Sequence, residues 1–158
     1  MGDIMSSGNQ FTVRAAVAAL AGAAIAVLAG AGSALAATPT PVTIEVITTS
    51  PAGGTFTTSG AGLCPSGTTT DQNFGTGGQS GFHANFHHRK TFTCADGSGT
   101  FTANVQAHLI FGSPTDSFTW NILSGTGAYT NLHGSGNGIG EELPTEIVDH
   151  FTGAVHFD

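Results

Sequence analysis

Gly125-Thr126-Gly127-Ala128-Tyr129-Thr130-Asn131-Leu132-His133-Gly134-Ser135-Gly136-Asn137-Gly138 is the stretch of the sequence that decides the fold. Its first glycines permit positive φ where the chain leaves a preceding strand. One helical turn over residues 128–132 would place Tyr129 and Leu132 three residues apart, as a plug over one end of a barrel. Glycine at 134, 136 and 138 then gives a strand one bare face, which a neighbouring backbone or aromatic ring can approach closely.

Alternating apolar and polar residues predict strands on both sides of this stretch. The expected inward rows are Val42, Ile44 and Val46; Phe56; Phe82, Ala84 and Phe86; Phe92 and Cys94; Phe101, Ala103, Val105, Ala107 and Leu109; Phe118, Trp120 and Ile122; and Ile147, Phe151, Val155 and Phe157. Asp96-Gly97 predicts a hairpin turn. Residues 60–81 are rich in glycine and are expected to form a long loop.

These segments make about seven or eight strands, and no amphipathic helix longer than one turn is expected. An antiparallel sheet of this size must close or form a sandwich to hide its edge strands. Short turns between sequential strands suit a meander. We therefore expect an all-β fold, an antiparallel closed barrel of about eight strands, with a β-sandwich as the alternative.

The N-terminal segment resembles a secretory signal peptide. Arg14 supplies a positive charge, residues 15–31 are apolar, and Ala34-Leu35-Ala36 is a small-x-small cleavage site. The sequence thus divides into a signal peptide (1–36), a linker (37–41) and a single β-barrel domain (42–158). The alternative is an uncleaved membrane anchor, because the apolar run approaches the length of a spanning helix.

Charge excludes several classes of partner. Residues 37–158 hold nine acidic residues and two basic ones, Arg89 and Lys90, for a net charge of −7. Nucleic acid is therefore not an expected partner, because the chain has few cations to replace the counterions of a phosphate backbone. An anionic membrane surface is disfavoured for the same reason, and no stable membrane association is expected after signal cleavage.

Two cysteines, Cys64 and Cys94, remain after removal of the signal. In an exported chain such a pair most simply forms one disulfide, which fits a secreted, extracellular protein. Closing this loop would stabilise the fold by about 3.5 kcal/mol on the chain-entropy model. The alternative is two free, buried thiols.

Residues 120–136 carry a family resemblance. Trp120-x-Ile122-x-Ser124-Gly125-Thr126-Gly127-Ala128-Tyr129-x-x-Leu132-x-Gly134-x-Gly136 resembles the G-T-G-x-(Phe/Tyr) segment of the allene oxide cyclase-like barrels, which include the plant dirigent proteins. The resemblance covers about 20 residues and implies an eight-stranded antiparallel barrel with a central cavity. In the plant enzymes that cavity binds or steers reactive apolar substrates, using a few buried polar groups.

Several groups of residues could in principle bind a metal ion or act as acids and bases. His83 and His87 lie on one face of a strand about 13 Å apart, too far to share a metal ion, and His88 follows them. Asp71, Asp96 and Asp116 are expected in loops, where they lack regular calcium-ligand spacing and suit turn capping. Five further side chains could act as acids or bases, but their spacing does not predict that they lie together: Tyr129, His133, Glu141, Glu142 and Asp149. We therefore expect no metal ion, no cofactor and no catalytic residue.

Aromatic side chains mostly fall in the inward rows, where they either fill the barrel or line a small cavity; a filled core is the preferred interpretation. They are Phe82, Phe86, Phe92, Phe101, Phe111, Phe118, Trp120, Phe151 and Phe157.

The leading functional hypothesis is a secreted binding or interaction protein, not an enzyme, that holds a small apolar ligand or associates with itself. The ligand-contacting candidates are Tyr129, His133, Trp120 and Phe118. One alternative is an isomerase or cyclase acting on a hydrophobic substrate, which requires at least one ionisable side chain inside the barrel. Another is an extracellular structural protein.

Overall fold

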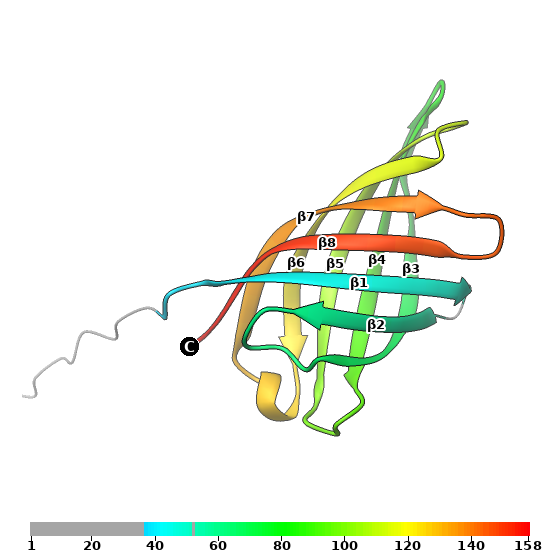
Figure 1. Ribbon diagram of the computed structural model, residues 1–158. Coiled ribbons are helices and arrows are strands. Elements are labelled where there is room, and N and C mark those ends of the chain that lie inside the picture. Colours follow the sequence, from blue (N-terminus) through cyan, green and yellow to red (C-terminus); the bar gives the residue numbers. More distant parts are fainter. Residues whose placement is uncertain (1–36, 52) are drawn as a thin grey trace, which may run out of the picture. The chain divides into compact units, whose positions relative to one another are not determined.

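Eight antiparallel strands close into a barrel in the computed structural model, which describes residues 37–51 and 53–158 (Figure 1). The predicted signal peptide, residues 1–36, lies outside the described residues. The strands are β1 (Thr40–Ser50), β2 (Gly53–Ser59), β3 (Ser66–Ser80), β4 (His83–Cys94), β5 (Thr100–Ile110), β6 (Thr115–Gly125), β7 (Leu132–Glu142) and β8 (Ile147–Phe157). Each pairs with its sequence neighbours, and β1 pairs with β8. The predicted closed barrel is confirmed, and the β-sandwich alternative is wrong.

The alternation of the sequence sets the inside and outside of the barrel. On β5, Phe101, Ala103, Val105 and Ala107 are buried, as the pattern predicts, while Gln106 between them is exposed. Because strand side chains alternate between the two faces, one apolar row per strand is enough to build the core. Removing these rows from water is the main force that closes the sheet.

Glycines on β7 allow aromatic rings to lie against its inner face. A methyl group on Gly138 would overlap the ring of Phe118, and one on Gly136 would lie 2.8 Å from Nε1 of Trp120. That indole N–H donates a hydrogen bond to the carbonyl oxygen of Asn137, at 3.2 Å. The bare strand face predicted from the glycine spacing is therefore confirmed.

One barrel end is closed by the segment between β6 and β7. A short 3₁₀ helix, η1 (Gly127–Tyr129), begins at Gly127, whose φ of +60° favours glycine. Tyr129 and Leu132 are both buried beneath it, as the predicted plug requires. The Tyr129 hydroxyl hydrogen-bonds Oγ of Ser98 at 3.2 Å. We call this the closed end, and Figure 1 shows η1 there, opposite the tips of the β3–β4 and β5–β6 hairpins.

An aromatic cluster fills the closed half of the barrel. Phe92 stacks on Phe101 with ring centroids 4.6 Å apart, and Phe151 lies edge-on to Phe92 at 5.9 Å. The cluster is defined as Phe56, Phe92, Phe101, Phe118, Trp120, Tyr129 and Phe151, all buried. The preference for a filled interior therefore holds for this half.

The expected loop over residues 60–81 is wrong, because most of it is β3. This strand pairs with β2 over residues 66–70 and with β4 over residues 67–80, with two bulges near Asn73 and Thr76. Its inward positions beside the core are Gly67, Thr69 and Asp71 instead of an apolar row. The backbone pairing therefore supplies the order that the side-chain pattern does not announce. The Cys64–Cys94 disulfide is present and ties the start of β3 to the end of β4.

The expected inward positions of two aromatic residues are wrong. Phe82 is 75% exposed and Phe111 is 47% exposed. Both sit in turns, where the backbone N–H of Phe111 donates to the carbonyl of Phe82 at 2.8 Å. The strand alternation does not extend into a turn, which explains the error.

No helix within residues 37–51 and 53–158 combines the length and apolar character needed to cross a bilayer.

Candidate ligand cavity at the open end of the barrel

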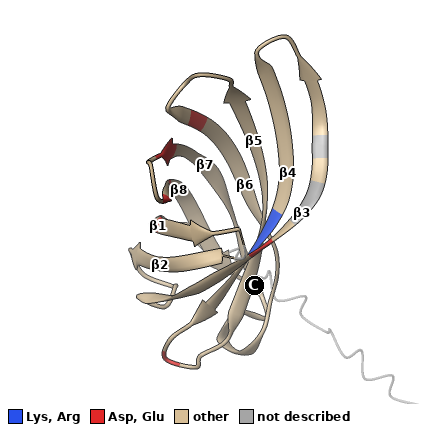
Figure 2. Ribbon diagram, turned by 90° about the vertical axis from the view of Figure 1, so that its right-hand side faces the viewer, with Lys and Arg blue, Asp and Glu red and all other residues tan. Residues whose placement is uncertain are grey.

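The interior of the barrel changes from aromatic to polar along β4. Counting back from Phe92, the next inward residues are Lys90 and His88, and then the partly buried Phe86. This change occurs toward the end formed by the β1–β2, β3–β4, β5–β6 and β7–β8 turns, which we call the open end. Figure 2 shows the basic segment of β4 lying beside an acidic position of β3 on a barrel with few other charges.

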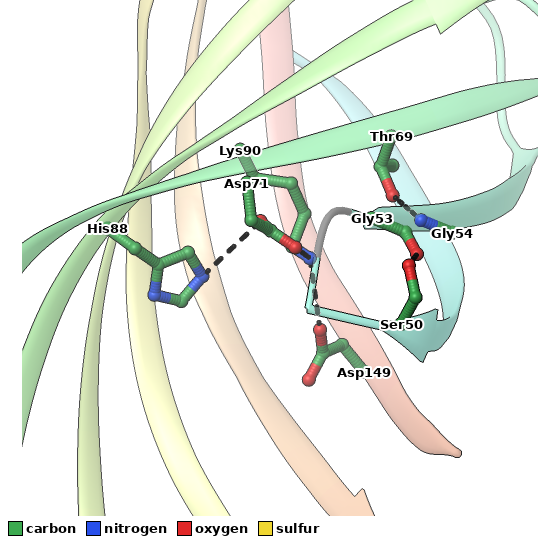
Figure 3. A network of polar contacts seen from close by, with 8 residues as sticks. All are labelled: Ser50, Gly53, Gly54, Thr69, Asp71, His88, Lys90 and Asp149. Carbon is green, nitrogen blue, oxygen red and sulfur yellow. Dashed lines mark hydrogen bonds and ion pairs between the residues drawn. The ribbon is translucent and has the colours of Figure 1, made fainter. Parts of the chain in front are cut away.

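Lys90 is the centre of the polar half. Its side chain is only 2% exposed, and its Nζ lies 3.0 Å from Oδ2 of Asp71 and 3.6 Å from Oδ2 of Asp149. Asp71 faces Lys90 directly in the β3–β4 register, whereas Asp149 comes from β8 across the interior (Figure 3). An ammonium group buried this deeply requires such pairing, because the cost of removing an isolated charge from water is large.

His88 lies beside the same carboxylate. Its Nε2 is 4.0 Å from Oδ1 of Asp71 (Figure 3). Burial and the neighbouring Lys90 ammonium lower the pKa of His88 below 6.5, and the attraction of Asp71 opposes them only in part. The imidazole is therefore neutral at pH 7 and able to accept a proton. We define Asp71, His88, Lys90 and Asp149 as the ionic cluster.

Two carboxyl groups near the open end resist ionisation. Burial raises the pKa of Asp149 in spite of the opposing attraction of Lys90. Burial also raises the pKa of Asp116, although its Oδ1 accepts a hydrogen bond from the backbone N–H of Gly140 at 3.2 Å. Both shifts have the sign expected when a carboxylate loses solvation.

A cavity of about 270 Å³ opens above the ionic cluster. Its lining divides into a polar floor and a mainly apolar wall. The lining residues are Thr48, Ser50, Pro51, Asp71, Phe86, His88, Lys90, Ala107, Leu109, Asp116, Ile147 and Asp149. A second hollow of about 180 Å³ shares Leu109, Asp116 and Ile147 with it and continues toward the β5–β6 turn. Such a mixture of apolar wall and few polar groups is typical of small-molecule sites.

Two buried oxygen atoms of the lining residues lack hydrogen bonds. Oγ1 of Thr48 and Oδ1 of Asp71 are both buried and have no hydrogen-bond partner among the described residues. Buried polar atoms are nearly always hydrogen-bonded, so two unsatisfied oxygens in one cavity are unusual for a purely structural site.

The four ligand-contacting candidates from the sequence lie elsewhere. Phe118 and Trp120 belong to the aromatic cluster, and Tyr129 closes the opposite end. His133 points outward and its Nε2 lies 3.0 Å from Oδ2 of Asp158. None of them lines the open-end cavity, and their role in binding stays a prediction.

The histidines and aspartates with possible metal-ligand chemistry lie on strands and in one turn. His83 and His87 point outward on β4, and His83 stacks on His108 at 5.3 Å. Asp96 caps its turn by accepting the Ser98 N–H at 2.9 Å, as expected. The expectation of loop positions for Asp71 and Asp116 is wrong, because they lie on β3 and β6. Within the described part of the chain, no group of three or more His, Cys, Asp or Glu side chains could hold a metal ion.

The sequence contained a signal for part of this site. Phe86, Phe92 and Cys94 fix which face of β4 points inward, so the same alternation places His88 and Lys90 inside. No such pattern marks Asp71, because the described inward positions of β3 carry no row of apolar residues. Comparison of the chain with protein-family models, with curated proteins and with solved structures gives no match.

Proposed function

We propose that this protein is a secreted binding protein that holds a small, mainly apolar molecule in the open-end cavity. The observation that carries the proposal is the cavity itself, a hollow with an apolar wall above a buried, charged floor. The closed half shows that this barrel can fill its interior with aromatic rings. A second half left hollow and lined with costly buried charges is better explained by a ligand than by stability.

The rim of the same barrel end supports an apolar ligand. Phe82, Ile110, Phe111 and Leu143 lie in or beside its turns and are between 43% and 75% exposed. Ile110 and Phe111 line the second hollow, and exposed apolar side chains at such a site favour the arrival of an apolar molecule from water. The resemblance of residues 120–136 to the allene oxide cyclase-like barrels, whose cavities hold apolar substrates, supports the same function.

Export is part of the proposal. The Cys64–Cys94 disulfide supports an oxidising compartment, and the signal-like residues 1–36 would direct the chain there. Expression of the full chain in a secreting bacterial host, followed by N-terminal sequencing, tests it. We expect mature protein beginning at Ala37 outside the cytoplasm; an intact N-terminus on a cell-associated chain would contradict export.

The binding proposal is tested with the neutral fluorescent probe Nile red. We expect saturable binding with a blue-shifted emission, which is lost when Leu109→Trp fills the hollow that both cavities share. The matched control is Leu123→Trp, which adds the same side chain to an exposed position on the outside of β6. Equal binding by both variants, or no binding by the natural protein, would contradict the proposal.

A second candidate function is an isomerase or cyclase acting on a hydrophobic substrate. The observation that favours it is the ionic cluster, which meets its requirement for ionisable groups inside the barrel. Neutral His88 would accept a proton, and Lys90 would stabilise developing negative charge. Incubation with unsaturated epoxides and chiral chromatography of the products tests it. Turnover that disappears in His88→Gln supports catalysis, and product ratios equal to those in buffer contradict it.

A further inference from the structure

The charge of the cavity floor disfavours a negatively charged ligand. Lys90 is the one cation among the described lining residues at pH 7, because His88 is neutral there. Its ammonium is already shared between Asp71 and Asp149. Asp116 adds a third acidic group to the lining, and its Oδ1 accepts from the backbone N–H of Gly140. A carboxylate entering this cavity would meet acidic oxygens and no available positive charge.

The hydrogen-bonding character of the floor points the same way. Oδ1 of Asp71 is an acceptor; it faces Nε2 of His88 at 4.0 Å, beyond hydrogen-bond distance, whereas Oδ2 contacts Lys90 (Figure 3). Oγ1 of Thr48 is the second buried oxygen without a partner among the described residues. A ligand group that donates several hydrogen bonds would satisfy both atoms, whereas a group that only accepts would leave Asp71 unsatisfied.

The apolar wall of the cavity restricts the rest of the ligand, the part that carries the donor group. Phe86, Leu109 and Ile147 line the same cavity above the floor, and Leu109 and Ile147 continue into the second hollow. The part of the ligand above its polar end is therefore apolar. It would extend from the floor toward the β5–β6 turn.

From this arrangement, which rests on the proposed binding function, we infer that the ligand is an apolar amine whose ammonium group binds between Asp71 and Thr48. An ammonium group supplies three donors and a positive charge, which suits one carboxylate oxygen without a hydrogen bond, one hydroxyl and an acidic lining. A neutral alcohol supplies a single donor and gains less from the carboxylates.

The test compares three ligands with closely matched bodies and different polar ends: 2-phenylethylamine, 2-phenylethanol and 3-phenylpropionate. We expect titration calorimetry at pH 7 to show the amine binding about tenfold more tightly than the alcohol, and the acid not binding. The advantage of the amine should shrink as salt is added, because it depends on charge.

Two variants locate the ammonium group. Asp71→Asn should remove most of the preference for the amine over the alcohol, and Thr48→Val, which changes the shape little, should weaken the amine several-fold. The control is Glu45→Gln on the outer face of β1, which changes the net charge by the same amount as Asp71→Asn and should leave the preference intact. If Asp71→Asn does not fold, Thr48→Val and the salt dependence still test whether the ammonium group binds at this position.

The outcomes separate the two proposals. If Nile red binds but the alcohol or the acid binds as tightly as the amine, the ammonium inference is overturned and the binding function stands. The inference is also overturned if Nile red binds and none of the three compounds does. If neither Nile red nor any of the three binds, both proposals fail.

Discussion

The closed and open halves of this barrel lie on the same strands but hold opposite kinds of side chain. On β4, Phe92 packs among aromatic rings, and Lys90, two residues away on the same face, lies between two carboxylates. The backbone pairing of β4 with its neighbours continues through both halves, with two bulges in β3 opposite the open half. The difference therefore resides in the side chains, and it separates the half that stabilises the fold from the half that is available for binding.

The largest expected effect tests the stabilising half. Phe151 is 1% exposed and contacts Phe92, Phe118 and Trp120. Phe151→Ala should lower the free energy of unfolding by about 3–5 kcal/mol, because it removes a buried ring and leaves a cavity. Urea unfolding followed by fluorescence measures it. Phe82→Ala, at an exposed turn, is the control and should change stability by less than about 0.5 kcal/mol; similar losses in both variants would contradict the assignment.

A smaller effect tests the packing of β7 against the rings. Gly138→Ala places a methyl group against the Phe118 ring, so the ring must move. We expect a loss of about 1–3 kcal/mol in the free energy of unfolding, the usual range for overpacking. Ser135→Ala, on the outer face of the same strand, should be close to neutral. A neutral Gly138→Ala would show that the bare face is not required.

These two variants also mark what could be predicted from the sequence. The inward row of β5 and the glycine face of β7 follow from simple alternation and spacing, because burial and close approach leave a clear residue pattern. The same is true of Tyr129 as a plug. Most of these features belong to the closed half, and the end of the β5 row, at Ala107 and Leu109, lines the open-end cavity.

The open half was harder to predict for a physical reason. Asp71 and Thr69 occupy inward positions of β3 where a typical strand would carry apolar residues, so the strand was mistaken for a loop. Asp149 meets Lys90 from β8, which lies across the barrel and far away in the sequence. The alternation of β4 places Lys90 and His88 inside, and that of β8 places Asp149 on the same face as Ile147 and Phe151, but neither pattern shows that the side chains meet. Residues from several strands together form a cavity, so the residue pattern within one strand cannot predict it.

The smallest expected effect is the pH dependence of the open half. Because the pKa of His88 is lowered on folding, the unfolded chain binds its proton more readily, so stability should fall as the pH drops below 6.5 toward the folded value. Asp149 and Asp116, whose pKa values are raised from 3.8, contribute in the opposite direction, stability falling as the pH rises through their titration.

Substitution of His88 separates its contribution to the pH dependence of stability from that of the carboxyl groups. His88→Gln should flatten the decline of stability as the pH falls below 6.5, because it removes the group that gains a proton on unfolding. His150→Gln, at an outward and largely exposed site on β8, is the control and should keep the decline. Thermal unfolding at closely spaced pH values measures both. An unchanged slope in His88→Gln would mean that another group carries the effect.

The most direct test of the contrast between the halves is the unfolding free energy of the combined variant Asp71→Val, Lys90→Met and Asp149→Val. Replacing a buried ionic group by apolar side chains is often neutral or stabilising by about 1–4 kcal/mol, whereas removing one partner alone costs about 3–5 kcal/mol. We predict a variant at least as stable as the natural protein that no longer prefers 2-phenylethylamine over 2-phenylethanol. A variant several kcal/mol less stable than the natural protein would show that the ionic cluster holds the barrel together, and would contradict the division of the barrel into a stabilising half and a binding half.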